Sequence, residues 1–329
     1  MTLPFTLRVD DEGDTLVTCC SEKCEIDLGI LQVSSKAVTL ASPVFQAMLN
    51  PSRGFKESQI AEDGIRHIRL ITDDFNLTTI VMNIIHHKNS RNPDSISLEE
   101  LYRLTDICDY YQVQEAIGPA VCNWVNHLWP LEKELRDCAR WLWIAKVFKL
   151  ENVFKECVQT SVFHIRMTST MLYTIDEVSL HSAMNEFARD VLWKRREKLV
   201  SRLIENSEAK VRTYQESLSK NQNVCKEDGA TACECDITQL GSLLSLKLLI
   251  GYPEANLDDF SLMEVCDIYK NIRSYGERIS FHKWGVSGNR ADHRRCNLSD
   301  GFRRVAEEVE ACKFLSVATN TQESGLENV

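Results

Sequence analysis

The sequence predicts an α+β fold, with a small β-sheet flanked by a helical cluster and followed by a mainly α-helical C-terminal region. The first observation is a set of short β-prone runs before residue 72, at residues 15–20, 26–33 and 65–71. The second is a helical hairpin over residues 33–49, too short to bury its apolar side without a sheet and further helices. The third is the 3- and 4-residue apolar spacing of the segments that follow, with strand signals fading after Pro130.

The helical hairpin has the sequence VSSKAVTLASPVFQAML. Ser34 and Ser35 are predicted caps of its first helix, because a serine oxygen can accept hydrogen bonds from the free amides of the first turn. Ser42 is the predicted cap of the second helix, with Pro43 at the first helical position, where the missing N–H is not needed. Its apolar residues form pairs four apart that share a face, namely Val44 with Met48 and Phe45 with Leu49.

Further helices follow the third predicted strand. Asp73 and Asp74 are candidate caps of an amphipathic helix that continues to about residue 85. Ser97 and Glu100 have the spacing of a capping box. A later helical stretch over residues 113–128 contains Pro119, which predicts an interruption or a restart at that point.

The chain divides into four predicted regions. A compact α+β domain covers residues 1–130, and a helical region covers 131–220. A C-terminal helical region that contains Cys and His covers 221–315, and residues 316–329 are expected to be a disordered tail.

Composition narrows the classes of function. The 329 residues are 43% hydrophobic and 26% charged, so a packed core is expected. The net charge of −10 argues against a general nucleic-acid binder, which needs a cationic surface. We expect no signal peptide and no membrane span. Because 13 cysteines in such a chain are most simply reduced thiols, we expect a protein of the cytoplasm or nucleus.

Motifs of catalysis are missing from the sequence. It contains no Gly-rich phosphate loop, no HExxH and no nucleophile-elbow pattern. We therefore expect a non-enzymatic protein that requires no cofactor.

A family resemblance covers about the first 125 residues. It begins in the helical hairpin and continues in order through GFKES (54–58), IRHIRLITDD (65–74), IVMNIIHHKN (80–89) and LYRLTDICDYYQV (101–113). This series resembles a BTB/POZ domain, particularly the type found in filamentous fungi. One departure is that Ser35 precedes Lys36, where many BTB domains have histidine. The resemblance implies an α+β domain that binds other proteins.

The same resemblance implies a cullin-binding site. Phe55, Lys56 and Glu57 match the hydrophobic-any-acid motif with which many BTB adaptors bind the cullin scaffold of a ubiquitin ligase. Phe55 would be the anchor and Glu57 the polar contact, with His86 where cullin-binding domains often have tyrosine. The region after Pro130 would then select the substrate. The alternative is that Phe55 packs under its loop and Glu57 is a solvated charge.

The resemblance also implies a homodimer. BTB domains commonly associate through the N-terminal strand and first helix, and FTLRV (5–9) is the candidate exchange strand. The alternative is that this run pairs within its own domain. The rival function is thus a homodimerising scaffold in transcriptional or other regulation, without a ligase role.

A cluster of cysteine and histidine residues is a candidate structural zinc site. Thiolate and imidazole ligands suit tetrahedral zinc, which would tie long loops together. The candidate ligands are Cys225, Cys233, Cys235, His293 and Cys296. The alternative is a set of free thiols without metal, since a free cysteine often acts as a small hydrophobic residue.

Overall fold

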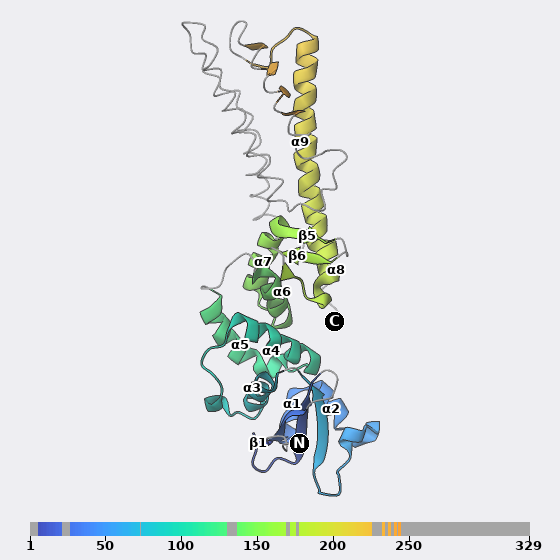
Figure 1. Ribbon diagram of the computed structural model, residues 1–329, viewed down its shortest axis with the longest axis vertical. Helices are drawn as coiled ribbons and strands as arrows, with labels where there is room; N and C mark the ends of the chain where they lie inside the picture. Colours follow the sequence, from blue (N-terminus) through green and yellow to red (C-terminus); the bar gives the residue numbers. More distant parts are fainter. Residues whose placement is uncertain are drawn as a thin grey trace. The chain divides into compact units, whose positions relative to one another are not determined.

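The computed structural model describes residues 6–21, 27–72, 74–129, 137–168, 172–175 and 178–225, with a few residues between 232 and 244. The chain forms two compact units, Met1–Phe154 and Lys155–Val329, and each is described by itself. Both contain helices and a small sheet, so the fold is α+β (Figure 1). Among the residues described, no helix is both long and apolar enough to cross a bilayer.

The first unit is built on a four-stranded sheet. Its strands are β1 (Thr6–Arg8), β2 (Thr15–Cys20), β3 (Asp27–Val33) and β4 (Arg66–Ile71), in the spatial order β1-β3-β2-β4. β2 and β3 are antiparallel, whereas β4 pairs with β2 in parallel and β1 pairs with β3 in parallel. The three strands predicted from the sequence are confirmed, and Thr6–Arg8 of the run at residues 5–9 pairs with β3 of the same chain.

Alternation of side chains along the strands places one face of the sheet in the core. Val17, Leu31 and Ile68 on this face are completely buried, because successive side chains point to opposite sides of a strand. Cys19 is also buried there, and burial raises the pKa of its thiol to about 12. The helices of this unit therefore pack against an apolar face of the sheet.

Two short helices follow β3 directly, α1 (Ser35–Ala41) and α2 (Pro43–Met48). Ser42 caps α2 as predicted, since its hydroxyl accepts the Phe45 amide at 3.0 Å. Ser34 occupies the cap position of α1, but its side chain makes no capping hydrogen bond, which corrects the prediction for this helix. The Phe45 ring stacks on Tyr111 with centroids 5.2 Å apart, so the hairpin is fixed to the helical cluster.

Three helices complete the cluster: α3 (Phe75–Ile85), α4 (Leu98–Tyr111) and α5 (Gln114–Leu128). Of the two candidate caps of α3, Asp74 caps the helix and Asp73 lies outside the described residues. Ser97 and Glu100 form the predicted capping box of α4. The prediction of a break at Pro119 is wrong, because α5 runs through it without interruption. Pro119 removes the hydrogen bond to the Glu115 carbonyl and crowds that carbonyl, but its exposed side leaves the carbonyl open to solvent and the helix continues.

The first unit continues beyond residue 130. Helix α6 (Cys138–Val147) packs against α4, and the indole Nε1–H of Trp143 donates to Asp106 Oδ1 at 2.7 Å. Trp141 and Trp143 are both buried in the core. The contacts of α6 therefore place it with the α+β unit, beyond the boundary expected at residue 130.

The second unit contains a small sheet in addition to helices, within the region after residue 130 that was predicted to be mainly α-helical. It contains a small antiparallel sheet of β5 (Ile165–Met167), β6 (Tyr173–Ile175) and β7 (Val178–Ser179), which follows α7 (Glu151–His164). The short α8 (Asn185–Phe187) and a π-helical turn over Ala188–Trp193 then lead into the predicted long charged helix, α9 (Lys194–Ser219). Trp193 joins these parts, because its ring lies 5.8 Å from that of Tyr173 and 4.3 Å from the guanidinium of Arg196.

Candidate protein-interaction surfaces

The loop between α2 and β4 is held by short-range hydrogen bonds. Asn50 caps a 3₁₀ turn over Pro51–Arg53 by accepting from the amide and hydroxyl of Ser52. Gly54 then adopts φ of +71°, a left-handed conformation that favours glycine. This conformation reverses the chain direction locally, directly before Phe55.

Glu57 lies in the second 3₁₀ turn of this loop, Lys56–Ser58, and Phe55 is the residue directly before that turn. The carbonyl of Phe55 accepts from both the amide and the hydroxyl of Ser58, at 3.1 and 2.6 Å, and Ser58 itself is buried. The Phe55 side chain is 47% exposed, and Glu57 is half-buried. A fixed backbone thus presents an aromatic ring to solvent, with a carboxylate two residues away.

His86 ends α3 and connects three segments. Its Nε2 accepts the backbone N–H of Ser34 at 2.9 Å, so the proton of the neutral ring is on Nδ1, which donates to the Met82 carbonyl at 2.8 Å. Burial lowers the pKa of His86, although the Met82 carbonyl and the charge of Asp10 act in the opposite direction. Both ring nitrogens are therefore used inside the domain.

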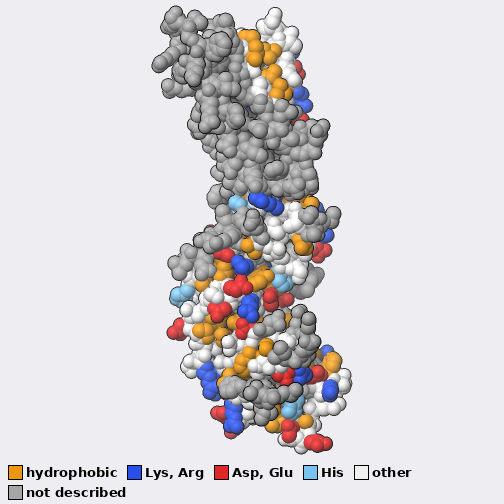
Figure 2. Space-filling view, in the orientation of Figure 1, with side chains coloured by type: hydrophobic (Ala, Val, Ile, Leu, Met, Phe, Trp, Pro, Cys, Tyr) orange, Lys and Arg blue, Asp and Glu red, His pale blue; other side chains and the backbone are white. Residues whose placement is uncertain are grey.

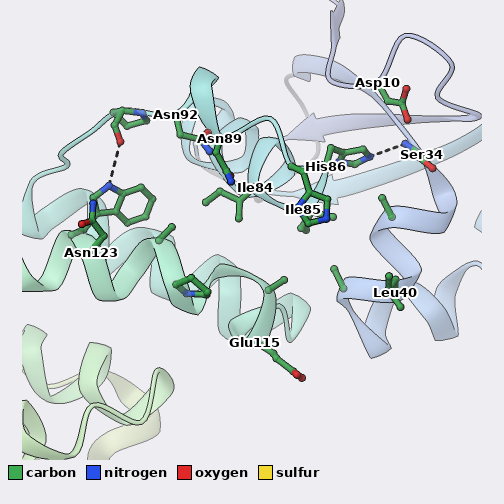
Figure 3. A pocket seen from close by; sticks show the side chains of 18 of the residues that line it. Asp10, Ser34, Leu40, Ile84, Ile85, His86, Asn89, Asn92, Glu115 and Asn123 are labelled. Atoms are coloured by element: carbon green, nitrogen blue, oxygen red, sulfur yellow. Dashed lines mark hydrogen bonds between the residues drawn. The ribbon is translucent and has the colours of Figure 1, made fainter.

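A groove of about 1120 Å³ opens beside His86. Figure 3 shows α1 with Leu40 on one side and α5 with Glu115 and Asn123 on the other, with Ile84 and Ile85 at the end of α3 between them. At the far end of the groove the Trp124 indole donates to the Pro93 carbonyl at 3.3 Å. All of these segments belong to the first unit, so the groove lies within one compact body.

The structure separates the residues predicted to bind a cullin. His86 lines the groove, whereas neither Phe55 nor Glu57 does. Sequence reasoning missed the groove and its most exposed apolar residue, Leu40, which is 91% exposed. A signal was present, because Leu40 lies two positions after the buried Val38 and thus on the opposite face of α1.

The candidate zinc site falls largely outside the described residues. Cys235, His293 and Cys296 are not described, while Cys225 is buried and Cys233 is exposed. The amide of Cys225 donates to a carboxylate oxygen of Asp236 at 2.9 Å. Within the described part of the chain, no three His, Cys, Asp or Glu side chains come together as a metal site, so the zinc site stays a prediction.

Figure 2 shows acidic, basic and apolar side chains interspersed over the coloured surface of the first unit on the face in view. Several charges form ion pairs, such as Arg69 with Asp27 at 2.7 Å and Arg140 with Glu99 at 3.0 Å. A mixed surface of this kind is more typical of protein contacts than of phosphate binding.

No protein-family model matches the chain, and a search of curated proteins found no match.

Proposed function

We propose that the first unit is a BTB/POZ domain and that the protein is a non-enzymatic protein–protein interaction module, acting as a substrate adaptor for a cullin-based ubiquitin ligase. The order of elements supports the proposal, since a two-stranded hairpin, a helical hairpin, a third strand and a helical cluster follow one another as the resemblance implies. The remaining described residues, from α7 to α9, would present the substrate-selecting surface.

The exposure of Phe55 is the observation that carries the ligase role. An aromatic ring that is 47% exposed on a hydrogen-bonded turn is ready to fill a pocket without reordering its loop. Glu57 would orient the partner through its carboxylate, as charged groups at interfaces commonly do.

A binding measurement with a purified cullin N-terminal domain tests this role. We expect wild-type protein to bind, and Phe55→Ala to weaken binding at least about tenfold, as for a central interface anchor. Glu57→Ala should weaken it less. Ile60→Ala is the matched control, because Ile60 is 60% exposed near the end of the same loop but lies outside the motif. If wild-type protein does not bind, the ligase role is lost.

The homodimerising scaffold is the second candidate, and the position of β1 favours it. β1 is an edge strand of three residues held by β3, and the Arg91 guanidinium donates to the Arg8 carbonyl at 3.0 Å. Edge strands can exchange between copies. This candidate predicts a dimer by light scattering and no binding to the cullin, and a monomer at micromolar concentration would contradict it.

A further inference from the structure

The groove between α1 and α5 has no role in the proposed cullin contact, because neither Phe55 nor Glu57 lines it. Its volume of about 1120 Å³ is slightly above the usual range of small-molecule pockets, and the groove is open to solvent. These dimensions suit a segment of polypeptide better than a compact ligand.

Small side chains line both walls of the groove. Ala37 and Ala41 are one turn apart on α1, and Ala116 and Ala120 are one turn apart on α5. Packed helices lie about 8–10 Å apart, and the distance is shortest where the contacting side chains are small. The small side chains on both walls would therefore let the backbone of a partner helix come close to α1 and α5.

Apolar side chains make this space favourable for a partner's apolar face. Ile84 and Ile85 are largely buried beneath the groove and still line it. Leu40 is 91% exposed at its edge. Covering Leu40 would remove its apolar surface from water, which is the main favourable contribution to such contacts.

The charges around the groove favour a cationic partner. Among the described residues that line it, the carboxylates are Asp10, Asp94 and Glu115, and Lys36 is the single lysine or arginine. Pro119 adds a further acceptor, because a proline cannot donate the helical hydrogen bond that the Glu115 carbonyl would otherwise accept. The α5 wall thus offers hydrogen-bond acceptors at Glu115, whereas the lysine of the groove, Lys36, lies on α1.

We propose that this groove binds an amphipathic α-helix of a partner protein, with leucine-like side chains facing Leu40 and Ile84 and a lysine or arginine beside Glu115. The site is separate from the Phe55 loop, so this proposal stands whether or not the protein binds a cullin.

The test uses the full chain and a fluorescent helical peptide of about 18 residues made of leucine and lysine in amphipathic order. A peptide with glutamate in place of lysine and a scrambled leucine–lysine peptide are the ligand controls. We expect the ordered leucine–lysine peptide to bind with a dissociation constant of about 10 µM or lower by fluorescence anisotropy, and both controls to bind at least about tenfold more weakly.

Three variants locate the binding to the groove. Leu40→Glu changes an exposed side chain, Glu115→Lys reverses the charge of an exposed residue, and Ala120→Trp fills the space. Each should weaken binding at least about tenfold. Glu62→Lys is the matched control, because it makes the same change of charge as Glu115→Lys at an exposed residue outside the groove, and it should bind as the wild type does. Circular dichroism checks that each variant is folded.

Two results would overturn the proposal. One is equal affinity of the leucine–lysine peptide for the wild type, Leu40→Glu and Glu115→Lys, which would mean that the peptide binds the acidic surface in general. The other is a wild-type dimer that Leu40→Glu converts to a monomer by light scattering, which would assign the groove to a second copy of the chain.

Discussion

The carboxylate of Asp14 holds the first turn of α1 through Ser35. One oxygen of Asp14 accepts the Ser35 amide at 2.7 Å, and the other accepts the Ser35 hydroxyl at 2.6 Å. The second oxygen also pairs with the Arg66 guanidinium at 2.8 Å, at the start of β4. One side chain before β2 therefore satisfies a free amide of α1 and joins the helix to two strands of the sheet.

Replacing Asp14 by Asn should destabilise the protein by up to about 1 kcal/mol at pH 7. Asn keeps an oxygen that can accept the Ser35 amide, but it loses the charge of the partly exposed Asp14–Arg66 ion pair. Burial raises the pKa of the Asp14 carboxyl, but hydrogen bonds from Ser35 and the charge of Arg66 outweigh it, so the pKa lies below its ordinary value of 3.8. The charge of Asp14 thus contributes fully to the stability of the folded state above about pH 4, and this contribution is lost as the pH falls through the folded-state pKa of Asp14.

Urea unfolding at pH 7 and pH 3 measures this effect. The difference between wild type and Asp14→Asn should be smaller at pH 3, and Asp11→Asn is the control because Asp11 is exposed nearby. An equal difference at the two pH values would mean that the charge of Asp14 is not involved.

Replacing His86 by Phe should cost about 1–3 kcal/mol at pH 7.5, because the Ser34 amide loses its acceptor in a half-buried position. The folded-state pKa of His86 lies below its ordinary value of 6.5, mainly because of burial, with Lys88 and His87 acting in the same direction and Asp10 opposing. The unfolded chain therefore binds the proton first, and the stabilisation is complete above about pH 6.5 and declines below it.

Chemical unfolding at pH 7.5 and 5.5 tests this dependence. The wild type should lose more stability over this interval than His86→Phe, and His87→Asn should behave as the wild type. His87 is the suitable control because it is exposed and has φ of +57°, which Asn tolerates. Parallel losses in wild type and His86→Phe would exclude His86 as the titrating group.

Two serines at cap positions should respond differently to alanine. The Ser42 hydroxyl accepts the Phe45 amide and donates to the Tyr111 carbonyl, and the residue is buried, so Ser42→Ala should cost about 1–3 kcal/mol. The Ser34 side chain makes no capping bond, so Ser34→Ala should change stability by no more than about 0.5 kcal/mol. Thermal unfolding of both variants makes the comparison, and similar losses in the two would contradict it.

Two glycines should respond to alanine with opposite signs. A Cβ at Gly13 would lie 2.6 Å from the Val33 carbonyl oxygen, so Gly13→Ala should destabilise by about 1–3 kcal/mol. A Cβ at Gly118 in α5 would meet no atom within 4 Å outside its chain neighbours and its own helix backbone. Gly118→Ala should therefore stabilise by up to about 0.5 kcal/mol, because the crowding of a Cβ by the next residue, Pro119, offsets part of the helical preference of alanine. The measurement is the denaturant midpoint, which should be lower than that of the wild type for Gly13→Ala and higher for Gly118→Ala. If both midpoints shift in the same direction, one of the two predictions is wrong.

Local patterns in the sequence predicted much of the first unit. The strands at residues 15–20 and 65–71 and the capping box of α4 are set by neighbours within a few residues, and the structure has them. The capping of α1 could not be predicted in the same way, because its acceptor is Asp14, which is 21 residues earlier in the chain. Strands of two or three residues in the second unit are too short for alternation to distinguish them from helix.

In the candidate surfaces too, features set by neighbouring residues could be predicted, whereas features that depend on distant residues could not. Phe55 could be singled out from a three-residue motif, and its side chain is 47% exposed. The groove was not predicted, because α1, the end of α3 and α5 contribute to it from three separate parts of the sequence. The hydrogen bond at Nε2 of His86 likewise could not be predicted, because its donor is Ser34, 52 residues away in the sequence.

Because β4 pairs with β2 but follows α2 in the chain, the sheet cannot be completed until β4 has been synthesised. Asp14 and Arg66 are 52 residues apart, and β4 is an edge of the sheet. During synthesis, a chain that has emerged only as far as α2 can form the antiparallel β2–β3 hairpin, but it leaves the β4 side of β2 uncovered. The exposed flank of β2 on a partly made chain is thus where two nascent copies could pair wrongly, and the arrival of β4 removes that hazard.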